Sequence, residues 1–232
     1  RREFRLPHEP PRSETGLKCG VCVNECIIAP SERGYCGLVE NAQGTLKRLA
    51  GTPERGLLEW YYDPLPTNCV AEWCCPAGTG AGFPKFAYRN GPEYGYFNLA
   101  VFYCACSFDC LCCQNSHFKQ KLKDMEPILS AESLANNVNN KVSCICYFGG
   151  DPAPQFPHSI KTSEIAVEES KGRILRVCWE TNGTENWTLL KRAAELSLAS
   201  GGCIKIDLKS FTESVNTALC GVSNIRTLEN FK

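Results

Sequence analysis

Apolar, strand-like segments alternate with helical segments from residue 98 onward, and this pattern constrains the fold more than any other feature of the chain. Strands are expected over 99–105, 142–148, 174–179 and 203–208. Helices are expected from Ser130 to about Asn140, over 158–171, from near Thr184, and from Phe211 to about Leu219. Such alternation is typical of a parallel sheet, so the sequence predicts an α/β fold.

Each expected strand leads to a polar or glycine-bearing motif at its carboxyl end. In chain order these are Cys106-x3-Cys110-x2-Cys113, Gly149-Gly150-Asp151-Pro152, Glu180-Thr181-Asn182-Gly183 and Lys205-Ile206-Asp207-Leu208-Lys209. Parallel α/β folds bind their ligands at the carboxyl ends of the strands. The sequence therefore predicts one binding site built from these motifs.

The chain contains 17 cysteines, and their spacing favours metal binding over disulfides. The count is odd, several cysteines lie in short x2 and x3 spacings, and 232 residues exceed the length of small disulfide scaffolds. Two glycosylation triplets, at Asn182 and Asn186, would suit a secreted protein, but such triplets are common by chance. Cys104, Cys144 and Cys146 lie on expected strands and are expected to be buried as small apolar side chains.

Cys106, Cys110 and Cys113 place three thiolates on one loop, whereas iron–sulfur clusters are usually held by four. A metal with one open position can bind substrate. The spacing resembles the signature of the radical S-adenosylmethionine (radical SAM) superfamily. The resemblance implies that the three cysteines hold a catalytic 4Fe-4S cluster and that SAM binds its fourth iron. It also implies reductive cleavage of SAM and abstraction of a hydrogen atom from a substrate.

The later motifs resemble those of one branch, that of the pyruvate formate-lyase activating enzyme and its relatives. In that branch the Gly149–Pro152 motif, with Glu in place of Asp151, binds the SAM amino group. Glu180 and Thr181, from the Glu180–Asn182 run, would join Asp207 around a cation near SAM, while Lys209 faces the SAM carboxylate. The Cys113-Gln114-Asn115 run also matches. One departure is Cys112, which stands where the family usually has an aromatic residue beside the adenine.

The resemblance implies a partial parallel (β/α) barrel of radical SAM type over 98–232, with about four β/α units and a truncated carboxyl terminus. The missing strands are expected either to lie outside this sequence or to come from a partner. Before this core, 1–16 is expected to be a flexible arm and 61–97 a loop-rich connector whose cysteines could supply a ligand to the next cluster.

The segment 17–60 is rich in cysteine and contains Cys19-x2-Cys22-x3-Cys26-x9-Cys36. Four thiolates spaced in this way can converge on one ion or cluster, so a second site holding zinc or iron is expected. Tetrahedral sulfur suits several metals, so the spacing leaves the metal open. A small hairpin is expected within 38–60.

The sequence thus predicts a radical SAM oxidoreductase of the activating-enzyme type, whose substrate by analogy could be a glycyl residue of a partner enzyme. An electron donor such as ferredoxin or flavodoxin is expected. The alternative is a non-catalytic iron–sulfur or zinc protein that relays electrons within a complex. The zero net charge gives no reason to expect nucleic acid. No apolar run approaches the ~20 residues of a membrane span, and a cytoplasmic protein is expected.

Overall fold

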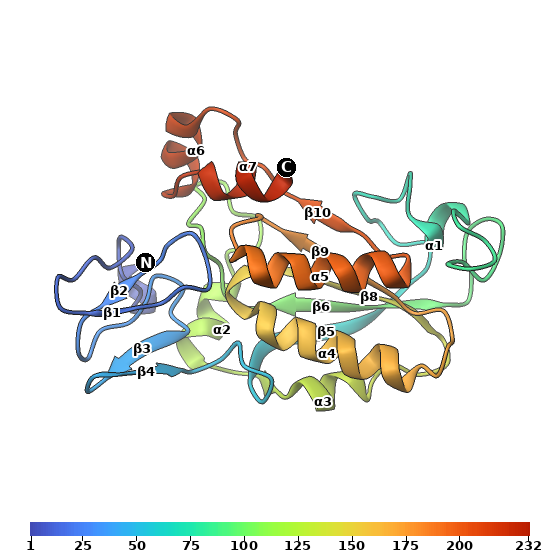
Figure 1. The fold of residues 1–232 in the computed structure, drawn as a ribbon, viewed down its shortest axis with the longest axis horizontal. Coiled ribbons are helices and arrows are strands. Elements are labelled where there is room, and N and C mark those ends of the chain that lie inside the picture. The colour runs from blue at the N-terminus through green and yellow to red at the C-terminus, as the bar shows by residue number, and fades with distance from the viewer.

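The computed structural model describes residues 1–232 and shows a mixed α/β fold built on one six-stranded sheet (Figure 1). The strands follow the order β10-β9-β8-β6-β5-β7 across the sheet. Their bounds are β5 Gly56–Pro64, β6 Phe97–Tyr103, β7 Ile128–Leu129, β8 Val142–Gly149, β9 Arg176–Thr181 and β10 Ile204–Ile206. The strands β6, β8, β9 and β10 are parallel to one another, which confirms the predicted parallel sheet, whereas β5 pairs with β6 in the antiparallel direction.

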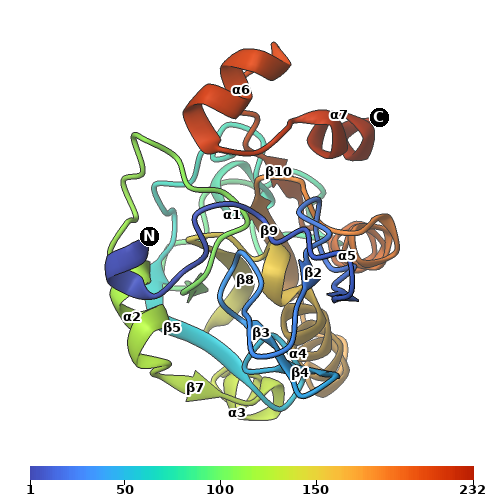
Figure 2. The same ribbon diagram turned by 90° about the vertical axis from the view of Figure 1, so that its left-hand side faces the viewer.

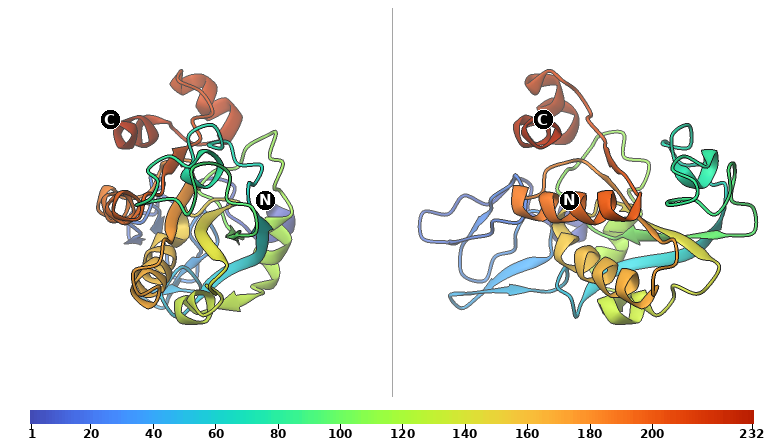
Figure 3. Two further views of the ribbon diagram at one scale, coloured as in Figure 1. Left: turned by 90° about the vertical axis from the view of Figure 1, so that its right-hand side faces the viewer. Right: turned by 45° about the vertical axis from the view of Figure 1, so that its right-hand side comes forward.

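Three helices cover one face of this sheet: α3 Ala131–Ala135, α4 Phe156–Glu169 and α5 Trp187–Ser200 (Figure 3). The main apolar core lies between them and the strands, and its largest buried side chains include Trp179, Tyr147 and Phe156. Side chains alternate across a strand. In β8, Ile145 and Tyr147 therefore face this core, whereas Cys144 and Cys146 face the opposite side of the sheet.

The remaining elements surround the two ends of the sheet. They are η1 Arg2–Phe4, β1 Leu17–Lys18, β2 Ile27–Ile28, β3 Val39–Ala42, β4 Thr45–Arg48, α1 Pro76–Thr79, α2 Phe118–Asp124, η2 Ala153–Gln155, α6 Glu213–Cys220 and α7 Ile225–Phe231. The expected hairpin within 38–60 is confirmed as β3–β4, whose two turn residues, Gln43 and Gly44, both have positive φ. No helix is long and apolar enough to span a membrane.

The N-terminal segment lies at the end of the sheet where the parallel strands finish (Figures 1 and 2). Backbone hydrogen bonds from Val23 N to Thr184 O (2.8 Å) and from Asn186 N to Val21 O (2.8 Å) attach it to the loop after β9. Within 1–16, Leu6 is buried and the Arg1 guanidinium lies 3.6 Å from the centre of the Tyr35 ring. The N-terminal segment is thus packed directly beside the strand-end motifs.

The structure differs from the sequence-based expectations at three places. The helix expected from Ser130 to Asn140 ends at Ala135, although Ser130 caps it as expected by accepting a hydrogen bond from Ser133 N. The 61–97 segment contains the last residues of β5, an antiparallel strand that the proline-rich sequence concealed. The helix α7 was not expected.

The sequence predicts an apolar core stripe of Trp187, Leu190, Ala194 and Leu198 in α5, but of these four only Leu190 is buried. Trp187, Ala194 and Leu198 are exposed, and the buried face carries Leu190, Ala193 and Ser197. The Ser197 hydroxyl donates to Val177 O (2.7 Å), and Val177 N donates to the Ser200 hydroxyl (3.0 Å). These bonds to β9 turn the serine-bearing face of the helix inward, because buried backbone groups need hydrogen-bond partners.

A buried histidine gives the fold a predictable response to acid. His158 Nδ1 lies 2.7 Å from the Tyr103 hydroxyl, and Nε2 lies 3.1 Å from Leu129 O. A carbonyl only accepts, so Nε2 carries the proton and Nδ1 accepts from Tyr103, which is the neutral form. Burial lowers the pKa of His158 to about 4. The other charged group that acts on it is Glu54.

Stability is therefore expected to fall as the pH drops below 6.5, because the unfolded chain then binds a proton that the folded chain does not. Between pH 6.5 and 5 the free energy of unfolding should decrease by roughly 1.5 kcal/mol from this residue. Urea denaturation at several pH values measures it. A His158→Gln variant should lose this part of the pH dependence, and an unchanged slope in that variant would contradict the assignment.

Candidate active site

The strand-end motifs surround one cavity of about 580 Å³ at the carboxyl ends of the four parallel strands. Of the residues predicted for the catalytic and cofactor site, those that line this cavity are Cys106, Cys110, Cys112, Cys113, Asn115, Gly149, Gly150, Asp151, Glu180, Thr181, Asn182, Asp207 and Lys209. Pro152 is buried behind Asp151 and does not line it. Residues more than a hundred positions apart in the chain thus meet at one place.

The cysteine loop follows β6 and is held by the end of α6. Asp109 N donates to Cys220 O and Leu111 N donates to Leu219 O, each at 2.9 Å. Burial raises the pKa of Cys106, and it raises that of Cys110 to about 12. A bound metal would reverse this preference, because a coordinating thiol loses its proton.

The chemistry of the donor set fits a 4Fe-4S cluster. Three thiols of one loop line one cavity, and cysteine thiolates are the usual ligands of such clusters. A cubane cluster distributes its ligands over several irons, so its thiolates need not meet at one point.

A buried hydrogen-bond network positions this loop from behind. Asn182 Nδ2 donates to the Ser107 hydroxyl (2.7 Å), and the Ser107 and Thr184 hydroxyls lie 2.8 Å apart. Asn24 Nδ2, from the N-terminal segment, donates to Ser107 O (2.7 Å). Sequence reasoning missed Ser107 and Thr184, and only their places inside two recognised motifs could have pointed to them.

The glycines of the second motif allow the ends of β8 and β6 to approach closely. Gly149 has a φ of +117°, and a Cβ there would lie 2.6 Å from Tyr103 N. A Cβ on Gly150 would lie 2.5 Å from Ala105 O. Asn115 Nδ2 donates to Gly149 O (3.1 Å), which links the cysteine loop to this motif.

The side chain of Asp151 makes hydrogen bonds inside the protein. Its carboxylate accepts from Ala153 N (2.9 Å), Asn182 N (2.9 Å) and the Thr181 hydroxyl (3.1 Å). The bonds from Asn182 N and the Thr181 hydroxyl join the ends of β8 and β9. The residues of this motif that line the cavity are Gly149, Gly150 and Asp151.

Asp151 and a second buried acid, Glu185, both lie within hydrogen-bond distance of the Thr181 hydroxyl. The Thr181 hydroxyl lies 3.1 Å from Asp151 Oδ1 and 3.0 Å from Glu185 Oε2, but it has one hydrogen to donate. Burial is the largest cause that raises the pKa of Asp151 to about 8 and that of Glu185 to about 7. The geometry and the two pKa shifts agree that this pair favours a protonated carboxyl.

The charged residues of β9 and β10 form two pairs. Glu180 Oε1 lies 2.6 Å from Lys205 Nζ, and Asp207 pairs with Lys209. Glu180, Thr181 and Asp207 were expected around one cation, but each has a different partner here. Lys205, which the motif contained without a role, lies beside Glu180 because β9 and β10 pair these two positions. Strand alternation with Asp207 could have indicated it.

The four cysteines of the N-terminal segment line a separate small cavity of about 10 Å³. They are Cys19, Cys22, Cys26 and Cys36. The structure brings this predicted set together without arranging three of them around one ion. Tyr35 N donates to Cys26 Sγ (3.3 Å), the kind of hydrogen bond that stabilises a thiolate.

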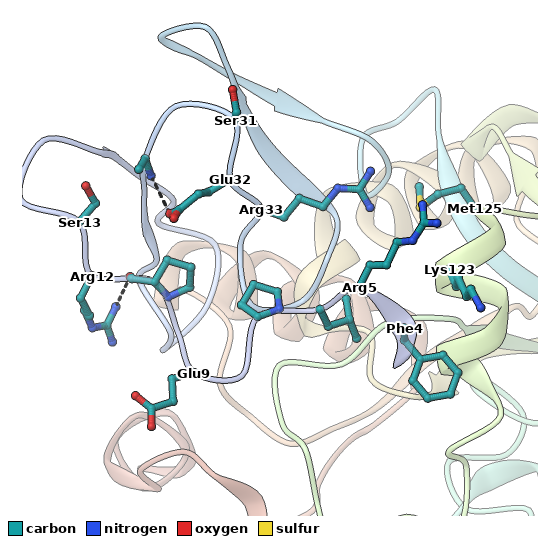
Figure 4. A pocket seen from close by; sticks show the side chains of 14 residues that line it. Phe4, Arg5, Glu9, Arg12, Ser13, Ser31, Glu32, Arg33, Lys123 and Met125 are labelled. Atoms are coloured by element: carbon teal, nitrogen blue, oxygen red, sulfur yellow. Dashed lines mark hydrogen bonds between the residues drawn. The ribbon is translucent and has the colours of Figure 1, made fainter. Parts of the chain in front are cut away.

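A larger cavity, of about 920 Å³, lies beside residues 4–13 (Figure 4). Its charged lining residues are Arg5, Glu9, Arg12, Glu32, Arg33 and Lys123. No cysteine and no strand-end motif lines it. Size therefore does not identify the site, and the chemistry of the lining favours the smaller cavity.

Comparison with protein-family models matches residues 100–232 to the radical SAM superfamily. The match covers more than half of the chain, and the protein belongs to this superfamily. Membership makes it a radical SAM enzyme and implies a 4Fe-4S cluster and SAM. No curated protein matches the chain. The observed sheet is consistent with the partial barrel of this superfamily.

Proposed function

We propose that the protein cleaves SAM reductively at the 580 Å³ cavity and abstracts a hydrogen atom from a substrate, as an enzyme of the pyruvate formate-lyase activating branch. One observation carries the proposal: the motifs at the ends of β8, β9 and β10 line the same cavity as the three-cysteine loop that follows β6. When bound, the cluster and SAM supply one-electron cleavage of the sulfur–C5′ bond, which gives methionine and the radical that attacks the substrate.

The chain's own residues bind and orient the cofactors. Cys106, Cys110 and Cys113 would hold the cluster, and the Asn182–Ser107 bond keeps their loop against the end of β9. The backbone of Gly149 and Gly150 would bind the SAM amino group, because Asp151 keeps these residues beside Thr181 and Asn182.

Lys209 lines the cavity and would face the SAM carboxylate, with Asp207 holding its ammonium in place. A buried or half-buried cation opposite a carboxylate lowers the cost of burying both charges. Cys112 takes the place beside the adenine, and Asn115 fixes the carbonyl of Gly149. These assignments are residue-level proposals that mutagenesis can separate.

By analogy with the branch, the substrate is a glycyl residue of a partner enzyme, and ferredoxin or flavodoxin supplies the electron. The Cys113–Asn115 run and the Asp207–Lys209 pair support this branch. A reducing cytoplasm suits a protein with 17 unpaired cysteines. We also propose the division into an arm (1–16), a cysteine-rich segment (17–60), a connector (61–97) and the core (98–232).

The test is an anaerobic assay of 5′-deoxyadenosine formation from SAM with a chemical reductant. The parent protein should form it, and Cys110→Ala should reduce its formation to the reagent background because the cluster loses a ligand. Cys74→Ala is the matched control, since Cys74 is exposed and lines none of the cavities described here. Equal product from the parent and Cys110→Ala would contradict the proposal.

The second candidate function is electron relay, and the convergence of Cys19, Cys22, Cys26 and Cys36 favours it. We propose that these thiols hold zinc or iron. Metal analysis of a Cys19→Ala, Cys22→Ala variant should show the loss of that metal, while the cluster of the 106–113 loop remains. A protein that binds metal but neither binds nor cleaves SAM would be a relay. Unchanged metal content in the variant would exclude the second site.

A further inference from the structure

A second cavity, of about 140 Å³, lies on the face of the sheet opposite α3, α4 and α5, and it is lined by six cysteines. We name it the thiol cavity; its cysteines are Cys69, Cys75, Cys144, Cys146, Cys178 and Cys203. About one cysteine would be expected among its 17 lining residues if the 17 cysteines were spread evenly over the chain. The cavity therefore contains many more cysteines than an even distribution would place there, which suggests a chemical role for them.

The strand register places three of these thiols in a row. Cys146 on β8 is the direct partner of Cys178 on β9. Cys203 precedes β10 and lies beside Cys178, with the two sulfur atoms 3.9 Å apart. Neighbouring strands lie about 4.8 Å apart, so the row spans three strands at one level. Cys144 lies two residues before Cys146 and faces the same side.

Two further thiols close the cavity from the connector. Cys69 Sγ lies 3.2 Å from Lys205 Nζ and 3.7 Å from Glu180 Oε1, and Cys75 caps the short helix α1. These connector cysteines therefore face the thiol cavity, whereas the sequence suggested that they could reach the cluster of the 106–113 loop. Thiols from the sheet and thiols from the connector thus line the same cavity.

A cation, the Lys205 ammonium group, also lies beside the thiols of this cavity. Lys205 Nζ lies 3.2 Å from Cys69 Sγ and 3.3 Å from Cys146 Sγ. An ammonium beside thiolates offsets their negative charge in a half-buried site. Lys205, Glu180 and Phe148 line both this cavity and the active-site cavity, so the two are neighbours.

We propose that the thiol cavity binds a second iron–sulfur cluster, next to the SAM site and distinct from both the 106–113 loop and the N-terminal cysteines. A single metal ion fits less well, because no three of these thiols are placed around one ion. A cluster distributes its thiolate ligands over several irons and needs inorganic sulfide. A disulfide between Cys178 and Cys203 would leave the other four thiols and Lys205 without a role.

The proposal is tested by iron and acid-labile sulfide content after anaerobic reconstitution of the full chain. The background is a Cys106→Ala, Cys110→Ala, Cys113→Ala variant, which lacks the catalytic cluster. Adding Cys178→Ala and Cys203→Ala should lower both iron and sulfide by one cluster per chain. Adding Cys19→Ala and Cys22→Ala instead should leave the iron and sulfide of this second cluster unchanged. Electron paramagnetic resonance of the reduced proteins reports the same cluster independently.

A variant in the connector tests whether the loss of iron and sulfide could instead come from misfolding of the sheet. Cys69→Ala with Cys75→Ala alters the loop alone and should also lower iron and sulfide, with unchanged circular dichroism. Unchanged iron and sulfide in both variants would overturn the proposal, as would a loss of metal without sulfide. Failure of SAM cleavage is a separate outcome, because the background variant cannot cleave SAM and must still contain the second cluster.

Discussion

Glu93→Ala is expected to lower the free energy of unfolding by about 3–5 kcal/mol, because it leaves Arg176 as a buried charge without a partner. Both side chains are fully buried. Arg176 donates to both carboxylate oxygens of Glu93, at 2.9 and 2.6 Å, and also to Ser143 Oγ (2.9 Å) and Phe86 O (2.7 Å). The pair thus fastens the connector to β8 and β9.

The direction of the Glu93 pKa agrees with this strong pairing. Burial opposes its ionisation, but the hydrogen bonds and charge of Arg176 exceed that effect and lower the pKa of Glu93. Urea denaturation at pH 7 measures the loss. Glu195→Ala is the matched control: its partner Lys191 is exposed, and such surface pairs contribute about 0–1 kcal/mol. Equal losses in the two variants would show that burial of the pair is unimportant.

Asp151→Ala is expected to raise the KM for SAM at least tenfold, or about 1.4 kcal/mol, while the iron content of the 106–113 loop is unchanged. The variant removes the acceptor for Ala153 N, Asn182 N and the Thr181 hydroxyl, and buried donors without partners cost about 1–3 kcal/mol each. Gly149 and Gly150 then lose their fixed position beside β9. The expected effect is on positioning, because the hydrogen bonds of Asp151 hold the end of β8 against the end of β9.

The isosteric Asp151→Asn variant separates positioning from folding. Its oxygen can still accept from Asn182 N, but its amide nitrogen would face Ala153 N, which is also a donor. An intermediate KM with nearly unchanged kcat is expected. Initial rates of 5′-deoxyadenosine formation over a range of SAM concentrations measure both constants. A fall in kcat alone, at unchanged KM, would show that Asp151 does not position the SAM site.

The four parallel strands and their terminal motifs could be predicted because apolar runs end sharply at cysteine, glycine or acidic residues. The antiparallel β5 could not, since its last residues, up to Pro64, belong to a proline- and glycine-rich segment. It forms because Trp60 and its neighbours pair with β6, and this pairing joins distant parts of the chain.

The candidate site was predictable to a similar extent. The spacing of the motifs identified the cavity lining, but it could not reveal that Asp151 accepts three hydrogen bonds from neighbouring residues or that Lys205 pairs with Glu180. Cys144 and Cys146 were expected to be buried as small apolar residues. The period-two pattern of β8 distinguishes two faces, but it does not say which one packs against helices and which one borders a cavity.

The hydrogen bonds of the N-terminal segment determine where the chain can be cut into fragments that still fold. Asn24 supplies a hydrogen bond to the cysteine loop, and Val21 and Val23 bond to the chain that follows β9. Fragments that begin at the compositional change near residue 98 would expose these donors and acceptors to water at the very loop that bears Cys106. We therefore expect the N-terminal segment to unfold together with the core, and we expect any fragment that folds on its own to include the first cysteines.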